Sequence, residues 1–192
     1  MSFRRPALAL ASVLACALPA VRAATVALPS DGQWLEFNVD DVVYQDLALH
    51  DYAADLNQAA SYSFTVASGQ RATLTVVDLG FAGDQFTLSD NGRSLGSTHA
   101  VQPDVNLSGA FYLSAASADQ ALADGSFSQG TWSFGEGSHT ITGVLSQSLL
   151  GMNSTNGALR LTVSAVPEPA SAASLLAGLG LLGAWARRRR AR

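Results

Sequence analysis

Two apolar runs, one near each end of this 192-residue chain, limit what can fold in water to the segment between them. The first run covers Ala7–Ala20 and the second covers Ala170–Ala186. They explain why hydrophobic residues reach 48% of the chain, since the middle has the composition of an ordinary water-soluble domain. We therefore expect a leader at 1–23, one domain at 24–165 and a tail at 166–192.

The leader has the order of a secretory signal peptide. Arg4 and Arg5 precede the apolar run, and the small residues that follow it predict cleavage between Ala23 and Ala24. The run is too short to span a bilayer comfortably, which takes about 20 residues. An alternative is a lipoprotein cleavage box that ends at Cys16, the single cysteine of the chain. With cleavage after Ala23, the mature domain has no cysteine and therefore no disulfide.

The tail begins with two prolines around a glutamate, in the tetrapeptide Val166, Pro167, Glu168 and Pro169. Proline opposes a helix and removes backbone donors, so we expect an extended segment that an enzyme's groove can reach. The next 17 residues would form a helix of about 25 Å, slightly shorter than the ~30 Å hydrocarbon core of a bilayer. The cluster after it predicts a cytoplasmic C-terminus and a domain outside: Arg187, Arg188, Arg189, Arg190 and Arg192.

This order of tetrapeptide, short Leu/Gly/Ala helix and terminal arginines resembles the PEP-CTERM sorting signal of Gram-negative bacteria over Val166–Arg192. Such tails also carry the label of an ice-binding-protein C-terminal domain, which says nothing about ice binding by this domain. The resemblance implies recognition by exosortase, an integral membrane enzyme that would cut near Pro167–Pro169 and release or transfer the domain outward. It also implies an association with exopolysaccharide and biofilm production.

The middle domain is acidic and contains no lysine. Three arginines against fourteen carboxylates give residues 24–165 a net charge of −11. Such a surface repels nucleic acid and anionic lipid, which excludes phosphate-binding functions. It favours cations or neutral, hydroxyl-rich partners such as polysaccharide.

Alternation of apolar and polar residues predicts β-strands across the domain. Short strands every 8–12 residues, with Gly, Asp and Ser between them, indicate an all-β fold, an antiparallel β-sandwich of jelly-roll or CUB-like type. The expected strands are Tyr62–Val66, Ala72–Val76, Phe86–Leu88, Arg93–Leu95, Thr131–Phe134, His139–Val144 and Ala158–Val163.

The connections are predicted from turn residues. Asp90-Asn91-Gly92 accepts positive φ and predicts a hairpin between 86–88 and 93–95. Gly135-Glu136-Gly137 predicts a second hairpin between 131–134 and 139–144. A helix of one or two turns is expected around Ser117–Ala123, and Asp40–Asn57 is interpreted as an irregular connection.

A longer pattern supports the same fold. Val77-Asp78-Leu79, Gly83-Asp84-Gln85-Phe86 and Asp90-Asn91-Gly92 follow one another in an order that resembles secreted microbial sandwich domains of unassigned function. The usual continuation of that pattern is present between Ala121 and Ile141. The resemblance implies a sandwich and no activity.

Catalytic signatures are missing from the domain. The segment Gly92–Gly96 has the order Gly-x-Ser-x-Gly, but it continues the predicted hairpin and so forms no strand-to-helix nucleophile elbow, and no cysteine remains for thiol chemistry. The histidines are too widely spaced for a zinc motif: His50, His99 and His139. Paired carboxylates, Asp40/Asp41 and Asp78/Asp84, leave a glycan-active hydrolase open as an alternative, since such enzymes use two carboxyls about 5–9 Å apart.

Two binding alternatives also stay open. Asp78, Asp84 and Asp90 flank one loop and one hairpin, and calcium takes clustered carboxylate oxygens. The competing interpretation is that Asp90 supports its own turn and that the other two are solvated in loops. A sugar-stacking platform is the second alternative, although aromatic residues on strands lie more often in a core: Trp34, Tyr44, Tyr52, Tyr112 and Trp132.

We therefore expect an exported, non-enzymatic structural or adhesive module that passes through an inner-membrane intermediate to the cell surface or extracellular matrix. Its expected partners are exosortase, the inner membrane and exopolysaccharide, and no cofactor is expected other than calcium. The first alternative is a calcium- or carbohydrate-binding lectin-like module. The second is a secreted glycan-active hydrolase.

Overall fold

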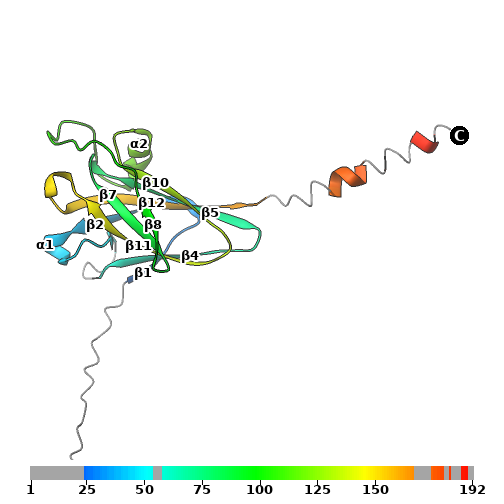
Figure 1. The fold of residues 1–192 in the computed structure, drawn as a ribbon, viewed down its shortest axis with the longest axis horizontal. Helices are drawn as coiled ribbons and strands as arrows, with labels where there is room; N and C mark the ends of the chain where they lie inside the picture. Colours follow the sequence, from blue (N-terminus) through cyan, green and yellow to red (C-terminus); the bar gives the residue numbers. More distant parts are fainter. Residues whose placement is uncertain (1–23, 54–57, 167–173, 180–181, 183–186, 190–192) are drawn as a thin grey trace, which may run out of the picture.

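The computed structural model describes residues 24–53, 58–166, 174–179, 182 and 187–189. Two five-stranded sheets form the domain (Figure 1). The first sheet has the order β1 (Ala24–Ala27), β4 (Ala60–Val66), β11 (Gly137–Gln147), β7 (Gln85–Asp90) and β8 (Arg93–Ser97). The second has the order β10 (Gln129–Phe134), β5 (Gln70–Asp78), β12 (Ser154–Ala165), β2 (Asp31–Asp40) and β3 (His50–Asp51). A two-stranded sheet of β6 (Gly80–Phe81) and β9 (Phe111–Tyr112) lies apart from both.

The inward faces of the two large sheets share one hydrophobic core. Residues of β4, such as Tyr62, and of β5, such as Leu74, alternate inward and are buried. Phe37 of β2 meets Phe86 of β7 edge to face, with ring centroids 5.0 Å apart, and so connects one sheet to the other. The predicted β-sandwich is therefore confirmed, because period-2 alternation requires one buried face for each sheet.

One strand pair departs from the antiparallel prediction. β1 runs parallel to β4, with Ala24 opposite Ala60 and Ala27 opposite Ser63. Only strands joined by a tight hairpin must be antiparallel, and between β1 and β4 the chain crosses to the other sheet to form β2 and β3. The sandwich is therefore mixed at this edge.

The second predicted hairpin is wrong. β10 pairs with β5 in one sheet, whereas β11 pairs with β4 and β7 in the other. Gly137, with a φ of +138°, belongs to the turn at which the chain crosses the sandwich. Phe134 and Ile141 then enter the same core from opposite sheets. An arch of this kind and a hairpin have the same alternation, so periodicity could not separate them.

The first hairpin is confirmed. β7 and β8 pair through Asp90 and Arg93, and the turn residues Asn91 and Gly92 have φ of 48° and 79°. The predicted helix at 117–123 is confirmed as α2 (Ala118–Ala123), preceded by the 3-10 turn η1 (Ala115–Ser117).

The interpretation of Asp40–Asn57 as irregular needs correction. It contains α1 (Asp41–Tyr44) and the short strand β3 (His50–Asp51). Asp40 caps α1, since one of its carboxylate oxygens accepts the N–H groups of Val42 and Val43 at 3.0 Å each. A helix of four residues is too short to have a periodic apolar face, which is why pattern alone did not indicate it.

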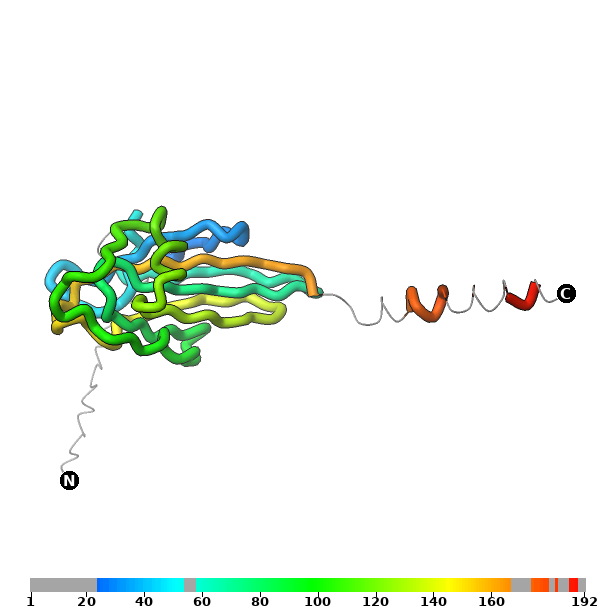
Figure 2. The backbone as a smooth tube through the Cα atoms, turned by 90° about the horizontal axis from the view of Figure 1, so that it is seen from above, coloured from blue at the N-terminus to red at the C-terminus, as the bar shows by residue number. Residues whose placement is uncertain are grey.

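The two ends of the sandwich differ. At one end β12 finishes at Ala165 beside Gln70, and we call this end the tail pole. At the other end Ser154 lies opposite Asp40 and Gly157 lies opposite Asp78, and we call this end the loop pole. Figure 2 shows β12 running along the length of the domain between them. Ala24 pairs with Ala60 near the loop pole, so the described domain begins and ends at opposite poles.

Only parts of the tail are described. Residues 174–179 and 187–189 are helical. Among the described residues, no helix has both the length and the apolar character needed to cross a membrane. Much of the predicted membrane segment Ala170–Ala186 falls outside the described residues, as does the leader at 1–23.

Candidate functional site

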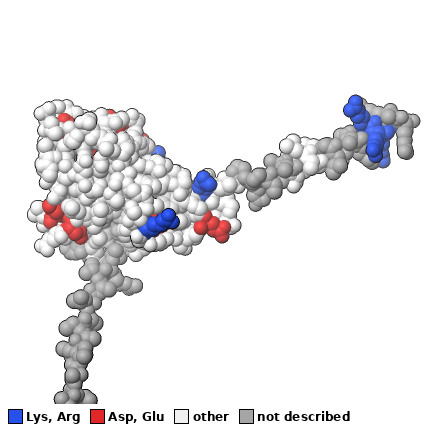
Figure 3. Space-filling view, viewed as in Figure 1, with Lys and Arg blue, Asp and Glu red and all other residues white. Residues whose placement is uncertain are grey.

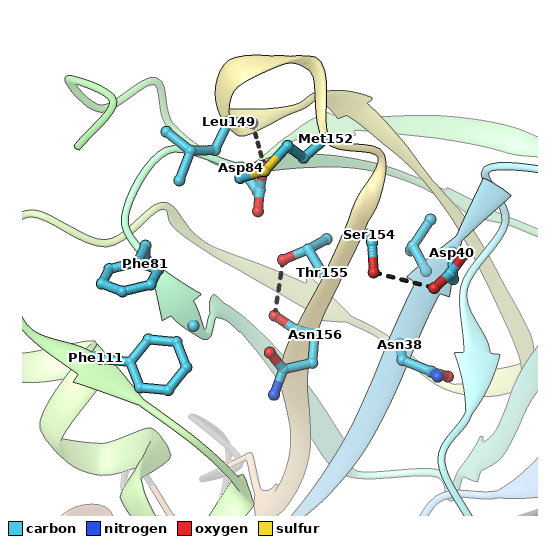
Figure 4. A pocket seen from close by; sticks show the side chains of 12 residues that line it. Asn38, Asp40, Phe81, Asp84, Phe111, Leu149, Met152, Ser154, Thr155 and Asn156 are labelled. Atoms are coloured by element: carbon cyan, nitrogen blue, oxygen red, sulfur yellow. Dashed lines mark hydrogen bonds between the residues drawn. The ribbon is translucent and has the colours of Figure 1, made fainter. Parts of the chain in front are cut away.

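A pocket of about 330 Å³ opens at the loop pole (Figure 4). The end of β2, the β6–β9 sheet, the 3-10 turn η2 (Leu149–Gly151) and the first residues of β12 form its walls. The β12–β2 register brings these segments together, because it places Ser154 opposite Asp40. The volume is at the lower end of the ~300–1,000 Å³ that is usual for small-molecule sites.

The β6–β9 sheet supplies an aromatic wall. Phe81 pairs with Phe111, and their ring centroids lie 4.5 Å apart at an interplanar angle of 43°. Gly80 has a φ of +78°, and a Cβ there would lie 3.4 Å from Oδ1 of Asn156. Glycine therefore lets this segment approach β12 closely. Phe111 is 49% exposed although it is a large apolar side chain.

Asp84 supplies the buried carboxyl of the pocket. It lies in the loop before β7, is 5% exposed, and accepts the N–H of Leu149 through Oδ1 at 2.5 Å. Burial raises the pKa of Asp84, while hydrogen bonds from the Thr155 hydroxyl and from the Leu149 N–H act in the opposite direction. Figure 4 shows the other carboxyl oxygen of Asp84 directed into the pocket.

Asp78 lies beneath the same loop and is fully buried at the end of β5. Its Oδ2 accepts the N–H groups of Gly83 at 3.3 Å and of Asp84 at 3.2 Å, so it holds the loop that carries Asp84. Its Oδ1 is buried and makes no hydrogen bond within the described part of the chain. Burial and then the charge of Asp84 raise the pKa of Asp78 well above its ordinary value. The predicted pairing of Asp78 with Asp84 is thus a spatial contact.

Asp90 is not part of this arrangement. It lies six residues after Asp84 at the far end of β7, which corresponds to about 20 Å along a strand. Its carboxylate is 2.8 Å from Nδ1 of His139 and accepts the N–H of Thr140 at 3.2 Å. The structure therefore separates Asp90 from Asp78 and Asp84, the other two predicted calcium ligands. No group of three or more His, Cys, Asp or Glu side chains suited to a metal ion occurs among the described residues.

Asp40 is the second carboxyl that lines the pocket. One of its oxygens caps α1, and the other accepts the Ser154 hydroxyl at 3.1 Å. The cap hydrogen bond from Val43 is the main cause that lowers the pKa of Asp40. Both oxygens are therefore engaged in holding α1 and β12 together.

The aromatic residues expected to form a platform are dispersed. Trp132 donates its indole N–H to the Leu95 carbonyl, and Tyr44 stacks on His50 with centroids 3.7 Å apart. Trp34 lies under the Arg160 guanidinium at 4.3 Å. Tyr112 packs on Phe127, and Tyr52 is exposed. The aromatic wall consists instead of Phe81 and Phe111, which lie outside any alternating run and so gave no sequence signal.

The sorting tetrapeptide follows directly from the last strand. The N–H of Val166 donates to the Gly69 carbonyl at 2.8 Å, one residue after β12 ends. Pro167, Glu168 and Pro169 lie outside the described residues, as do Ala23 and Arg190. Arg187, Arg188 and Arg189 belong to the short helical segment.

Comparison with known proteins bears on the tail. Residues 165–190 match the family model of the PEP-CTERM protein-sorting motif. The motif implies export, recognition by exosortase and a membrane-anchored sorting intermediate. Among solved structures, the pre-peptidase C-terminal domain of a collagenase from Bacillus anthracis matches at 11% identity and a TM-score of 0.38, over 73% of this chain and 95% of that chain. No curated protein matches the chain.

Proposed function

We propose that this protein is a non-enzymatic adhesive or structural module of the cell envelope or exopolysaccharide matrix, because its tail carries a PEP-CTERM sorting motif. The observation that carries the proposal is the path of β12, which runs from the pocket at the loop pole to the sorting motif at the tail pole. The single strand β12 thus connects the sorting motif to the loop pole, which is the end of the domain farthest from the motif.

The length of β12 determines how far the pocket lies from the sorting motif. From Ser154 to Ala165 the strand extends about 36 Å at ~3.3 Å per residue. Val166 is held to the β4–β5 turn by its hydrogen bond to Gly69, so the motif begins at the tail pole. A protein held through its tail would therefore turn the loop pole and its pocket outward.

The carboxyls of the pocket favour binding over hydrolysis. A glycosidase needs two carboxyls free to face one glycosidic bond. Asp40 has both oxygens committed to the α1 cap and to Ser154, which leaves Asp84 as the carboxyl that faces the pocket. This supports a non-enzymatic role over the glycan-active hydrolase.

The calcium alternative is weakened because Asp90, the third predicted ligand, contacts His139 instead of the pocket. Asp78 in turn has Oδ2 occupied by two backbone N–H groups of the loop. Both observations fit a structural role for these carboxyls, so our proposal includes no resident metal.

The proposal is tested in the producing cells with Glu168→Ala. We expect this variant to remain unprocessed in the inner membrane, because the glutamate between two prolines is the charged feature that an enzyme's groove can read. Mass spectrometry of the C-terminus and fractionation into membrane, surface and matrix would check this. Glu136→Ala in the β10–β11 turn is the matched control, expected to be processed like the wild type. Normal processing of Glu168→Ala, or a wild-type protein absent from surface and matrix, would contradict the proposal.

A further inference from the structure

We propose that the pocket at the loop pole binds a neutral saccharide unit, a ring with several free hydroxyl groups and no charge. The inference rests on the proposed adhesive function and names the ligand class of that module. It follows from three properties of the pocket: a wall of hydrogen-bond acceptors, a wall of aromatic rings, and the charge around it.

The acceptor wall is formed by Asp84 and Asn156. Asp84 uses Oδ1 for the Leu149 N–H and turns its other oxygen into the pocket, where the Thr155 hydroxyl is also a donor to this carboxyl (Figure 4). Asn156 donates its amide N–H groups to Glu36 at 3.4 Å and to the Leu113 carbonyl at 3.3 Å. These bonds fix the amide so that Oδ1 faces Gly80 and the aromatic side. A ligand that satisfies two such acceptors must itself carry hydrogen-bond donors, and the hydroxyls of a sugar do so.

The aromatic wall provides the complementary surface. Phe81 and Phe111 stand on one side of the pocket, with Leu149 and Met152 above the polar side chains (Figure 4). A pyranose ring has a face of C–H groups and a rim of hydroxyls, so it can place the face on the phenyl rings and the rim on the acceptors. Half-exposed phenylalanine on a two-residue strand contributes little to the core, which is consistent with a role in contact.

The charge excludes acidic sugars. The domain carries a net charge of −11, and both carboxyls of the pocket, Asp40 and Asp84, would repel a uronate or a phosphate. On the face seen in Figure 3, acidic side chains gather over α1, which lies beside this pole. Asp40 keeps its negative charge although three neutral donors engage it, so a cationic sugar is included among the probes to separate attraction by charge from recognition of hydroxyl groups.

The test is calorimetry on the purified exported protein, with tetramers of glucose, galactose, mannose, glucosamine and galacturonic acid as probes. We expect saturable binding of at least one neutral tetramer and weaker binding of the galacturonate. Phe111→Ala should weaken the neutral tetramer about tenfold or more. Leu113→Ala, which removes a 72% exposed side chain two residues away and outside the pocket, should change the affinity less than about twofold.

Asp84→Asn supplies a second variant that keeps the shape of the side chain and its acceptor for the Leu149 N–H. It should weaken binding about fivefold while the unfolding midpoint in urea does not fall below that of the wild type. Equal losses in Phe111→Ala and Leu113→Ala, no binding of any neutral tetramer, or tighter binding of the glucosamine or galacturonate tetramer would overturn the inference.

A retention assay separates this inference from the proposal on which it rests. If wild-type protein stays in the matrix and Phe111→Ala is released from it, both stand. If Phe111→Ala is retained like the wild type, the module is adhesive through another surface, and the inference about the pocket is wrong. If the wild type itself is not retained, the adhesive function fails first.

Discussion

The tail pole and the loop pole of this sandwich are built in opposite ways. At the tail pole the connections are tight turns, and their backbone groups pair locally, as when the Gln70 N–H donates to the Ala67 carbonyl. At the loop pole longer connections follow the strands, and this pole contains two buried carboxyls, Asp78 and Asp84, and the half-exposed Phe111. Strands such as β5 and β12 run from one pole to the other, so the difference lies mainly in the connections.

The contrast also appears in the backbone. Within the described ranges, four residues other than glycine have positive φ, and three of them lie at the loop pole: Gln45, Leu107 and Leu150. Such conformations cost of order 1–3 kcal/mol and persist when surrounding structure imposes them. Strain, buried charge and exposed apolar surface thus occur together at the pole that contains the pocket, and the tail pole supplies the stable attachment.

The largest predicted difference is between the stabilities of two variants, each of which replaces one phenylalanine by alanine. Phe86 is fully buried between the sheets, and Phe86→Ala should lower the free energy of unfolding by about 3–5 kcal/mol. Phe111→Ala at the pocket rim should lower it by about 1 kcal/mol, since half of the side chain is already exposed. Urea unfolding of both variants would measure the difference. Equal losses would show that the β6–β9 sheet is part of the core.

Prediction from sequence succeeded where the information is local. The β7–β8 hairpin was predictable because Asn91 and Gly92 themselves tolerate positive φ. The arch between β10 and β11 was not, because the choice of sheet depends on partners about 70 residues away, such as Val66 opposite Gly137.

The site shows the same division. Asp78 and Asp84 are near in sequence, and their pairing was predicted. Phe81 and Phe111 are 30 residues apart in irregular segments, and only the β6–β9 pairing brings them together. Asn156 lies two residues before the predicted strand Ala158–Val163, and its neighbours are set by the register of β12 with β2 and β5.

A second prediction concerns pH. Because the folded protein raises the pKa of Asp78, it binds more protons than the unfolded chain above the ordinary pKa of aspartate. Stability should therefore fall as the pH rises from the ordinary pKa of aspartate toward the raised pKa of Asp78 in the folded protein, with a slope of at most about 1.4 kcal/mol per pH unit for one proton. The folded protein lowers the pKa of Asp104 and of Asp124. Their contribution to the stability of the fold is therefore lost only as the pH falls through these lowered pKa values.

Asp78→Asn isolates this contribution. The variant should show a shallower decline of stability with rising pH and should be more stable than the wild type at the alkaline end of the titration, because the amide does not ionise. Asp104→Asn, on an exposed loop of the same pole, is the control and should keep the wild-type slope. An unchanged slope in Asp78→Asn would assign the pH dependence to other groups, Asp84 first.

The smallest predicted effect compares backbone strain at the two poles. Gly69 at the tail pole has a φ of +72° and open space around an added Cβ, so Gly69→Ala should cost about 1 kcal/mol through the backbone alone. Leu150 at the loop pole has a φ of 55° and a largely exposed side chain. Leu150→Gly should relieve the strain and, after the entropic cost of glycine, stabilise the fold by about 0.5 kcal/mol. Urea unfolding resolves the sign. A loss in Leu150→Gly as large as that in Gly69→Ala would mean that the leucine side chain contributes packing at the loop pole, and that the strain there is offset within the fold rather than kept for a ligand.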